Sequence, residues 1–395
     1  MRFDDGIFQL STAFGPSGFF DQLIGEGDGA AVSEVPGQAR VAAVSFAEDI
    51  STLVIGTAFV DRLALARDYN SSEFPTTIDP VSSGIHATDT SSQPSDDFLG
   101  NGQSGYLIEN TGSSAGLVGI GEVVGGQAGY IFPTSLDPSQ YSIVGTGDYL
   151  GDGKSDLLVE NIGGAAGLIG IGEISNGQVA FTFPTALTPS GQWNVVGSGD
   201  FLGDGNDQFL IENTGANAGL VGIGELTGGQ VAFTFPTALA TSQWNIVGVG
   251  DFLGDGKSDI LIENIGSNAG LVGIGEVTGG QVSFSFPTAV AAGQWKFVGT
   301  GDFFGDGKDQ FLIENIGTSA GLLGIGEANN GQVAFTFPTT LASQWTIVGT
   351  GDYLAEGHDQ ILLESTSGAI DIGDYTSGQV HLTQVSSLPP DWTFH

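Results

Sequence analysis

Short runs of apolar residues, each of strand length, recur along residues 97–395 and are separated by glycine, asparagine, aspartate or proline. The segment 251–300 holds four of them, at 260–262, 269–276, 281–286 and 294–298. The third run alternates apolar and polar residues, and no run has the length or the spacing of an amphipathic helix. The pattern therefore predicts four short β-strands in this segment.

The same four-run pattern occurs six times, with a spacing of about 51 residues. Each copy is headed by a tag close to Gly-Asp-Phe-Leu-Gly-Asp-Gly, and the first acid of its loop falls at Asp97, Asp148, Asp200, Asp251, Asp302 and Asp352. A fixed period means one supersecondary unit stacked on itself, and four strands in about 50 residues is the size of a propeller blade. We predict an all-β fold, a β-propeller of six four-stranded repeats over residues 96–395.

How the ring closes is left open by the repeats. Each copy begins at the same phase, and the last one ends inside its fourth strand, at Trp392–His395. The repeats alone therefore indicate no strand borrowed across the closure. Either six blades close unaided, or the distinct N-terminal segment 1–95 supplies a seventh blade or a covering strand. We favour the second alternative because a ring needs its strand edges paired.

Aromatic residues follow the same period. The tryptophans lie at Trp193, Trp244, Trp295, Trp345 and Trp392, and Tyr141 takes this place in the first copy. Pairs of phenylalanines two residues apart, such as Phe233 and Phe235, share one face of a strand. We predict that these rings fill the space between blades, since aromatic burial dominates core energetics. The alternative is a ring of exposed aromatic side chains that stack on sugars.

Residues 1–95 differ from the repeats and contain all four arginines of the chain. The run 38–47 has the pattern of a strand. Residues 49–69 fit a helix capped by Asp49 or a strand over 52–60, and both alternatives stay open. Residues 70–96, rich in serine, threonine and proline, are typical of an extended linker. This segment is a candidate extra blade, cap or assembly arm.

The acidic loops carry a candidate calcium site. In Asp148-x-x-x-Asp152-Gly153-x-x-Asp156, carboxylates occupy loop positions 1, 5 and 9, with glycine at 6. Calcium takes six to eight oxygen ligands, and the glycine permits a sharp turn around the ion. The candidate ligands are Asp148, Asp152 and Asp156 in the second copy, Asp251, Asp255 and Asp259 in the fourth, Asp200 and Asp204 in the third, and Asp302 and Asp306 in the fifth.

The loop motif and its period resemble the FG-GAP (VCBS-type) repeat, a calcium-loop blade of integrin-α-like propellers and of bacterial surface proteins. The resemblance covers residues 97–395, and Gly-Asp-Phe-Leu-Gly-Asp-Gly-Lys-Ser-Asp at 250–259 carries it best. It implies calcium binding and an extracellular or cell-surface location. The chain departs from the family at loop position 3, where Leu150 and Leu253 replace an oxygen ligand. The alternative is that the loops are turns closed by side-chain-to-backbone hydrogen bonds, with these leucines in the core.

Two further rings of acids follow the period. One ends the first strand of each copy, at Glu109, Glu160, Glu212, Glu263, Glu314 and Glu364. The other ends the second strand, at Glu122, Glu173, Glu225, Glu276, Glu327 and Asp374. Such rings can bind cations or a basic partner, and the plainer alternative is that they face water or hydrogen-bond neighbouring turns.

The net charge of the chain limits the classes of binding partner. The chain has 45 acidic and 8 basic residues and a formal net charge of −37. Nucleic acid and anionic membrane surfaces are excluded as partners because both need lysine and arginine. No apolar stretch is long enough to span a membrane. The chain has no cysteine, and its acidic N-terminus lacks the apolar core of a signal peptide, so export is expected to be leaderless.

Catalysis has little support in the sequence. His86, His358, His381 and His395 share no place in the repeat, and no Ser-His-Asp spacing is present. We therefore predict a non-enzymatic secreted or cell-surface propeller that binds a glycan or a protein. One alternative is a structural subunit that self-associates into a filament or lattice. The second is an enzyme acting on polysaccharide, with the N-terminal segment shaping a cleft.

Overall fold

The structure is a computed structural model that describes residues 30–33, 41–44, 96–188 and 190–395. The chain divides into two compact units, Met1–Ile85 and His86–His395. In the first unit, β1 (Ala30–Ser33) and β2 (Val41–Val44) pair antiparallel, with Ala30 opposite Val44. Strand β2 lies within the predicted strand 38–47. The predictions for 49–69, and for the linker up to residue 95, fall outside the described residues.

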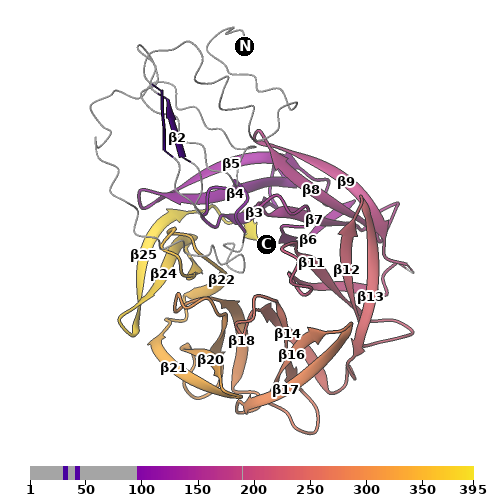
Figure 1. Cartoon of the computed structure of the whole chain (residues 1–395). Coiled ribbons are helices and arrows are strands. Elements are labelled where there is room, and N and C mark those ends of the chain that lie inside the picture. The colour runs from indigo at the N-terminus through magenta and orange to yellow at the C-terminus, as the bar shows by residue number, and fades with distance from the viewer. Residues whose placement is uncertain (1–29, 34–40, 45–95, 189) are drawn as a thin grey trace. The chain divides into compact units, whose positions relative to one another are not determined.

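The second unit is a ring of six four-stranded antiparallel blades (Figure 1). This confirms the predicted all-β propeller. We name the blades by the copy of the acidic loop that each contains. The second, third and fourth blades are β6 (Tyr141–Gly147), β7 (Asp156–Asn161), β8 (Leu168–Ser175), β9 (Gln178–Ala186); β10 (Trp193–Gly199), β11 (Gln208–Asn213), β12 (Leu220–Thr227), β13 (Gln230–Ala238); and β14 (Trp244–Gly250), β15 (Asp259–Asn264), β16 (Leu271–Thr278), β17 (Gln281–Ala289).

The fifth and sixth blades are β18 (Trp295–Gly301), β19 (Gln310–Asn315), β20 (Leu322–Asn329), β21 (Gln332–Thr340); and β22 (Trp345–Gly351), β23 (Gln360–Ser365), β24 (Ala369–Thr376), β25 (Gln379–Ser387). The first blade combines the C-terminal strand β26 (Trp392–Phe394) with β3 (Tyr106–Asn110), β4 (Leu117–Val124) and β5 (Gln127–Ser135). Within the described residues there is no helix, and hence none that could cross a membrane.

The ring closes by a strand borrowed across the closure, contrary to the prediction. Strand β26 pairs antiparallel with β3, with Trp392 opposite Asn110 and Phe394 opposite Ile108. The prediction was wrong because the repeated tag begins inside a blade: each tryptophan strand forms the inner edge of the blade that follows it. The strand after the last repeat therefore completes the first blade, and the described residues form six blades.

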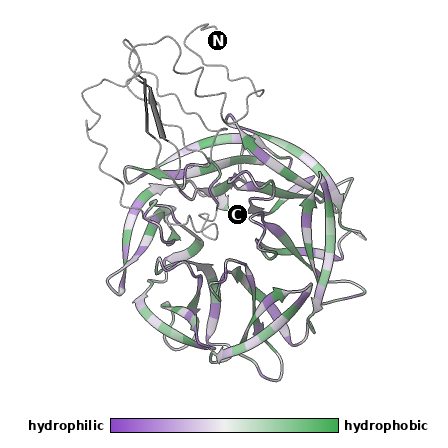
Figure 2. Ribbon diagram, in the orientation of Figure 1, coloured by the Kyte–Doolittle hydropathy of each residue, from purple (hydrophilic) through white to green (hydrophobic). Residues whose placement is uncertain are grey.

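The core lies in the seams between adjacent blades. One cluster joins Phe201, Leu210 and Val221 of the third blade to Ile260 and Ile262 of the fourth, all at most 1% exposed. In Figure 2 green and purple bands alternate along the strands, as expected where successive side chains leave opposite faces. Each periodic tryptophan, and Tyr141, packs against one of the six seam clusters. This confirms the predicted place of these rings.

The phenylalanine pairs are divided between core and surface. The first member, for example Phe233, packs into the seam between the second and third blades. The second member, Phe235, is 46% exposed, and Phe183, Phe286 and Phe337 are exposed to a similar degree. The prediction of two core residues per pair is therefore wrong for the second one. Phe235 instead leans against the half-buried Trp193 of the same blade, with ring centroids 5.7 Å apart.

The two ends of the ring carry different loops. The acidic loops join the first and second strands of a blade, as at 200–207, and share their end with the turn at 228–229 between the third and fourth strands. We call this end the acidic-loop face. The loops between second and third strands, as at 214–219, and the linkers between blades lie at the other end. We call that end the opposite face.

One residue of the sixth acidic loop adopts a backbone conformation that favours glycine. Ala355 has φ 54°, where the other five loops have glycine, such as Gly305 with φ 66°. A left-handed backbone costs a non-glycine residue about 1 kcal/mol. We expect Ala355→Gly to raise the free energy of unfolding by about 0.5–1 kcal/mol, partly offset by unfolded-state entropy. Denaturant unfolding of A355G and of the reciprocal control Gly305→Ala measures this, and equal midpoints for both variants and the wild type would contradict it.

Candidate functional site

The first acid of every acidic loop closes its own loop. In the fourth loop the Asp251 Oδ1 atom accepts hydrogen bonds from the amides of Gly254 at 2.7 Å and Asp255 at 3.1 Å, and its Oδ2 atom accepts one from Gly256 at 2.8 Å. The corresponding bonds recur at Asp97, Asp148, Asp200, Asp302 and Asp352. The loops are therefore turns closed by side-chain-to-backbone hydrogen bonds.

Loop position 9 bonds back to the residue at position 3. In the second and fourth loops, Asp156 and Asp259 accept a hydrogen bond from the amides of Leu150 and Leu253. In the third, fifth and sixth loops the side-chain oxygens of Gln208, Gln310 and Gln360 accept the same bond. Glutamine thus replaces aspartate as an acceptor without adding a charge. Leu150 and Leu253 are each 40% exposed, which corrects the prediction that they are tucked into the core.

In the second and the fourth acidic loop, three carboxyl groups lie close together. Asp156 and Asp259 are buried, and desolvation together with the neighbouring loop acids raises the pKa of each to about 8. The Asp259 Oδ1 atom has no hydrogen-bond partner within the described part of the chain. In the third and fifth loops only Asp200 with Asp204, and Asp302 with Asp306, come together, because glutamine occupies position 9.

These observations bear on calcium in opposite ways. The crowding of carboxyl groups fits a cation in the second and fourth loops, and the unpartnered oxygen of Asp259 fits one in the fourth. The first acid, however, already accepts amide bonds on both oxygens, and Asp152 and Asp255 have lysine partners at 2.9 and 3.8 Å. Calcium binding by these loops stays a prediction.

Adjacent acidic loops are joined by hydrogen bonds that cross the seams. The amide of Asp207 donates to the Asp148 carbonyl at 2.9 Å, while the Asp207 carboxyl accepts from the Asp148 amide at 2.8 Å. Asp309 with Asp251, and Asp359 with Asp302, form the same reciprocal pair. We call these three pairs the aspartate clasps. At the other three seams Ser104, Ser155 and Ser258 take the place of the clasp aspartate, and their amides donate the same backbone bond.

The clasp carboxyl groups are buried beside other acids. Desolvation is the largest cause that raises the pKa of Asp207 and of Asp309 to about 6, and of Asp359 to about 8. The backbone leaves them little room: a Cβ on Gly250 would lie 2.6 Å from the Asp309 Oδ2 atom. The repeated glycine before each loop therefore admits the clasp of the next blade.

The seams carry a different set of side chains toward the opposite face. In β7, Leu158 packs into the seam with the third blade, and Glu160 lies on the same face of the strand two residues on. Trp193 and Phe235 of the third blade border this seam. At every seam the same alternation puts one glutamate of the first ring on one blade and a periodic aromatic residue on the next blade. The sequence showed the six periodic glutamates and the six periodic aromatic residues as separate sets. In the structure the two sets recur together, one member of each at every seam.

The glutamates of this ring differ in their partners. Glu314 pairs with Lys296 at 2.8 Å, and Glu109 pairs with His395 at 2.8 Å. Desolvation raises the pKa of the remaining four, Glu160, Glu212, Glu263 and Glu364. A carboxyl group whose pKa is raised holds its proton at a higher pH and can donate it.

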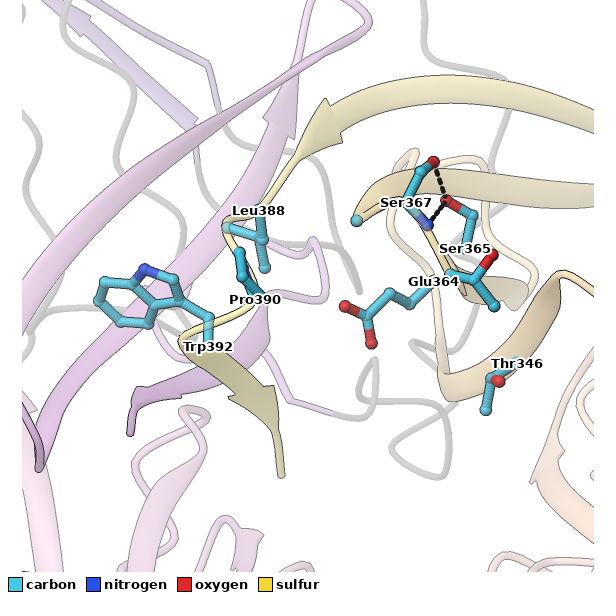
Figure 3. Close-up of a pocket in the computed structure, with 9 residues that line it drawn as sticks. Thr346, Glu364, Ser365, Ser367, Leu388, Pro390 and Trp392 are labelled. Atoms are coloured by element: carbon cyan, nitrogen blue, oxygen red, sulfur yellow. Dashed lines mark hydrogen bonds between the residues drawn. The ribbon is translucent and has the colours of Figure 1, made fainter. Parts of the chain in front are cut away.

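The sixth seam opens into a pocket of about 480 Å³. The loop between β23 and β24 spans 366–368, whereas the equivalent loop of the fifth blade spans 316–321. The pocket is lined by Thr346, Glu364, Ser365, Thr366, Ser367, Gly368, Leu388, Pro390 and Trp392. Figure 3 shows the Glu364 carboxyl group pointing into the space between the loop that carries Ser365 and Ser367 and the chain segment from Leu388 to Trp392.

An aromatic pair borders this pocket, which we call the closure pocket. The Trp392 indole points away from Glu364 in Figure 3 and packs against Phe132, with ring centroids 5.6 Å apart. Phe132 is 48% exposed. The closure pocket therefore combines one carboxyl group, several hydroxyl groups and an exposed aromatic surface. Sequence reasoning missed it, although the three-residue shortening of the sixth copy was a visible signal.

The chain was compared with known proteins. No protein-family model matches it, and no curated protein matches it. Similar solved structures include a protein of Lactobacillus plantarum at 13% identity, covering 72% of this chain and 82% of that one with a TM-score of 0.44. A periplasmic gluconolactonase of Pseudomonas aeruginosa has 13% identity, coverages of 73% and 98%, and a TM-score of 0.39. A rhamnogalacturonan lyase of Bacillus licheniformis has 14% identity, coverages of 70% and 63%, and a TM-score of 0.30.

These similarities concern the fold, and they give no support to two of the predictions from the sequence. The prediction of a non-enzymatic binding protein is not kept: it has no support among these structures, which include a gluconolactonase and a lyase. At such low identity the likeness is one of fold, and it assigns no substrate or reaction to this chain. None of the comparisons supports the FG-GAP family, so the chain stands as a six-bladed β-propeller.

Proposed function

We propose that this protein is an enzyme that acts on a polysaccharide in the closure pocket. The observation that carries the proposal is the break in the sixfold repeat at the sixth seam, where a shortened loop exposes Glu364 inside a cavity. Active sites are concave, with a few convergent polar groups and a titratable residue whose pKa is shifted. The other glutamates of the ring lie in seams whose loops keep their full length.

The side chains of the pocket suit a sugar. Ser365, Ser367 and Thr346 offer hydroxyl groups that donate and accept hydrogen bonds, as sugar hydroxyls do. Trp392 and Phe132 offer an apolar aromatic surface next to them. The same aromatic pairing recurs at Trp193 and at other seams, which suits a ligand made of repeated units.

The charge of the protein selects the class of polysaccharide. A chain with a net charge of −37 repels a polymer of uronic acids, so the substrate is neutral or carries amino groups. In the proposed reaction the Glu364 carboxyl group donates its proton to the glycosidic oxygen of the leaving sugar as the bond from that oxygen to the anomeric carbon breaks. A water molecule adds its hydroxyl group to the anomeric carbon and gives its remaining proton to the Glu364 carboxylate. Desolvation raises the pKa of Glu364, which favours the protonated form that this role requires.

The test is a screen for release of reducing ends from neutral and amino polysaccharides by the full chain. We expect Glu364→Gln to lower kcat at least about 100-fold, the usual contribution of a positioned general acid. Glu263→Gln removes the same carboxyl group at a seam without the shortened loop and serves as the matched control. Equal loss in both variants, or no turnover of any polymer by the wild type, would reject the proposal.

A further inference from the structure

The sixth blade carries a second group of polar side chains. It lies at the acidic-loop face, whereas the closure pocket lies toward the opposite face. The His358 Nε2 atom lies 2.8 Å from an Asp374 carboxyl oxygen and 4.0 Å from one of Glu356. One donor atom from each of these three residues lies within 4.8 Å of the others. They come from the acidic loop and from β24.

A second histidine belongs to the same surface. His381 of β25 is the direct cross-strand partner of Asp374. Side chains of directly opposed residues leave the same face of a sheet with their Cβ atoms about 5 Å apart. His381 is exposed, so its ring is free to turn toward the Asp374 carboxyl group. The surface therefore offers two imidazoles and two carboxylates.

The other blades show what this group replaces. Lys154 of the second loop is bonded to Asp152 at 2.9 Å, and Lys257 of the fourth approaches Asp255 at 3.8 Å. In the sixth blade histidine stands in place of this lysine, Glu356 in place of the loop aspartate, and Asp374 in place of the glutamate of the second ring. His381 stands where the fifth blade has Ala334. Four changes from the repeat thus coincide at one place.

We propose that these residues bind a divalent transition-metal ion of the zinc type. Imidazole nitrogen and carboxylate oxygen are ligands of Zn²⁺ at about 2.0–2.2 Å, arranged as a tetrahedron. Two ligand atoms of such a site are about 3.4 Å apart. The distances of 2.8 and 4.0 Å around the His358 Nε2 atom bracket this value, so small rotations complete the site. The bound cation replaces the positive charge that lysine supplies in the other loops.

The test uses the untagged full chain with calcium in excess, so that any sites in the acidic loops are occupied. Titration with Co²⁺ reports a tetrahedral histidine site by its visible absorption, and calorimetry with Zn²⁺ gives the stoichiometry. We expect one ion per chain. His358→Lys installs the residue of the second, fourth and fifth loops and should lower the affinity at least 100-fold and remove the Co²⁺ bands.

Two further variants test which histidines bind the ion. His381→Ala should weaken Zn²⁺ binding about tenfold or more if His381 is the fourth ligand. His395→Gln changes a histidine outside the group and should leave binding unchanged. Thermal unfolding without metal shows that each variant is folded. Absence of the Co²⁺ bands in the wild type, or equal binding by H358K, would overturn the proposal.

Discussion

Removal of residues 392–395 should destabilise the propeller by about 5 kcal/mol or more. Strand β26 supplies the inner strand of the first blade, and its Trp392 and Phe394 pack into the seam with the sixth blade. Loss of a large buried aromatic side chain typically costs about 3–5 kcal/mol, and these two rings are partly buried. The deletion also leaves β3 as an unpaired strand edge, which invites association between chains.

Denaturant unfolding and light scattering measure this effect. The matched control removes His395 alone, which takes away its ion pair with Glu109 and its backbone bond to Leu107 but keeps β26. We expect the control to unfold within about 1 kcal/mol of the wild type, the usual size of an exposed ion pair. A four-residue deletion that stays monomeric and unfolds at the wild-type midpoint would show that the ring does not depend on the borrowed strand.

The second large effect is a gain of stability on acidification. The folded protein holds the pKa of Asp207 and of Asp309 at about 6, whereas an aspartate in an unfolded chain titrates near 3.9. Between these two values the folded state binds more protons than the unfolded state, so the free energy of unfolding falls as the pH rises. The stabilisation is complete below about pH 4 and is lost as the pH passes about 6. A shift of about two units corresponds to about 3 kcal/mol per group as an order of magnitude.

Unfolding midpoints from pH 8 to pH 4.5 at constant ionic strength test this sign. In the double variant Asp207→Asn with Asp309→Asn, the amide oxygens still accept the clasp bonds but do not titrate, so the midpoint should vary less with pH. Asp137→Asn is the control because Asp137 is exposed and its pKa is lowered by Ser139. A double variant with the full wild-type pH dependence would exclude the clasps as its source.

The repeat was enough to predict the blades but not their limits. The period of the tags gives the number of units, since each unit buries its strands against the next. The tag itself, however, lies between the first and second strands of a blade, so reading each copy from its tag assigned Trp392 to the wrong blade. Hydrogen bonding between β26 and β3, not sequence similarity, decides that boundary.

The acidic loops show a similar division. From the sequence, Asp148 and Asp251 were candidate calcium ligands or, alternatively, turn-forming acids, and the hydrogen bonds show that they form the turns. The role of position 9 depended on a neighbouring blade. Where residue 8 is Asp207 or Asp309, that residue forms a clasp, and glutamine at position 9 takes over the local bond. The clasp bond joins two neighbouring blades, so no pattern within one copy of the repeat predicts it. The closure pocket was not predicted for the same reason, since the loop 366–368 and the segment 388–392 line one cavity only where β26 pairs with β3 across the closure.

The borrowed strand also orders events during synthesis of the chain. The second to sixth blades are each made of consecutive residues and can form as they leave the ribosome. The first blade has to wait, because Asn110 meets its partner Trp392 only after the remaining 282 residues (392 − 110) have been made. Contacts so distant in sequence form slowly, since the chain between them must first be ordered. The edge of β3 is therefore the last surface of the propeller to be covered, and the nascent protein is most exposed to mispairing there.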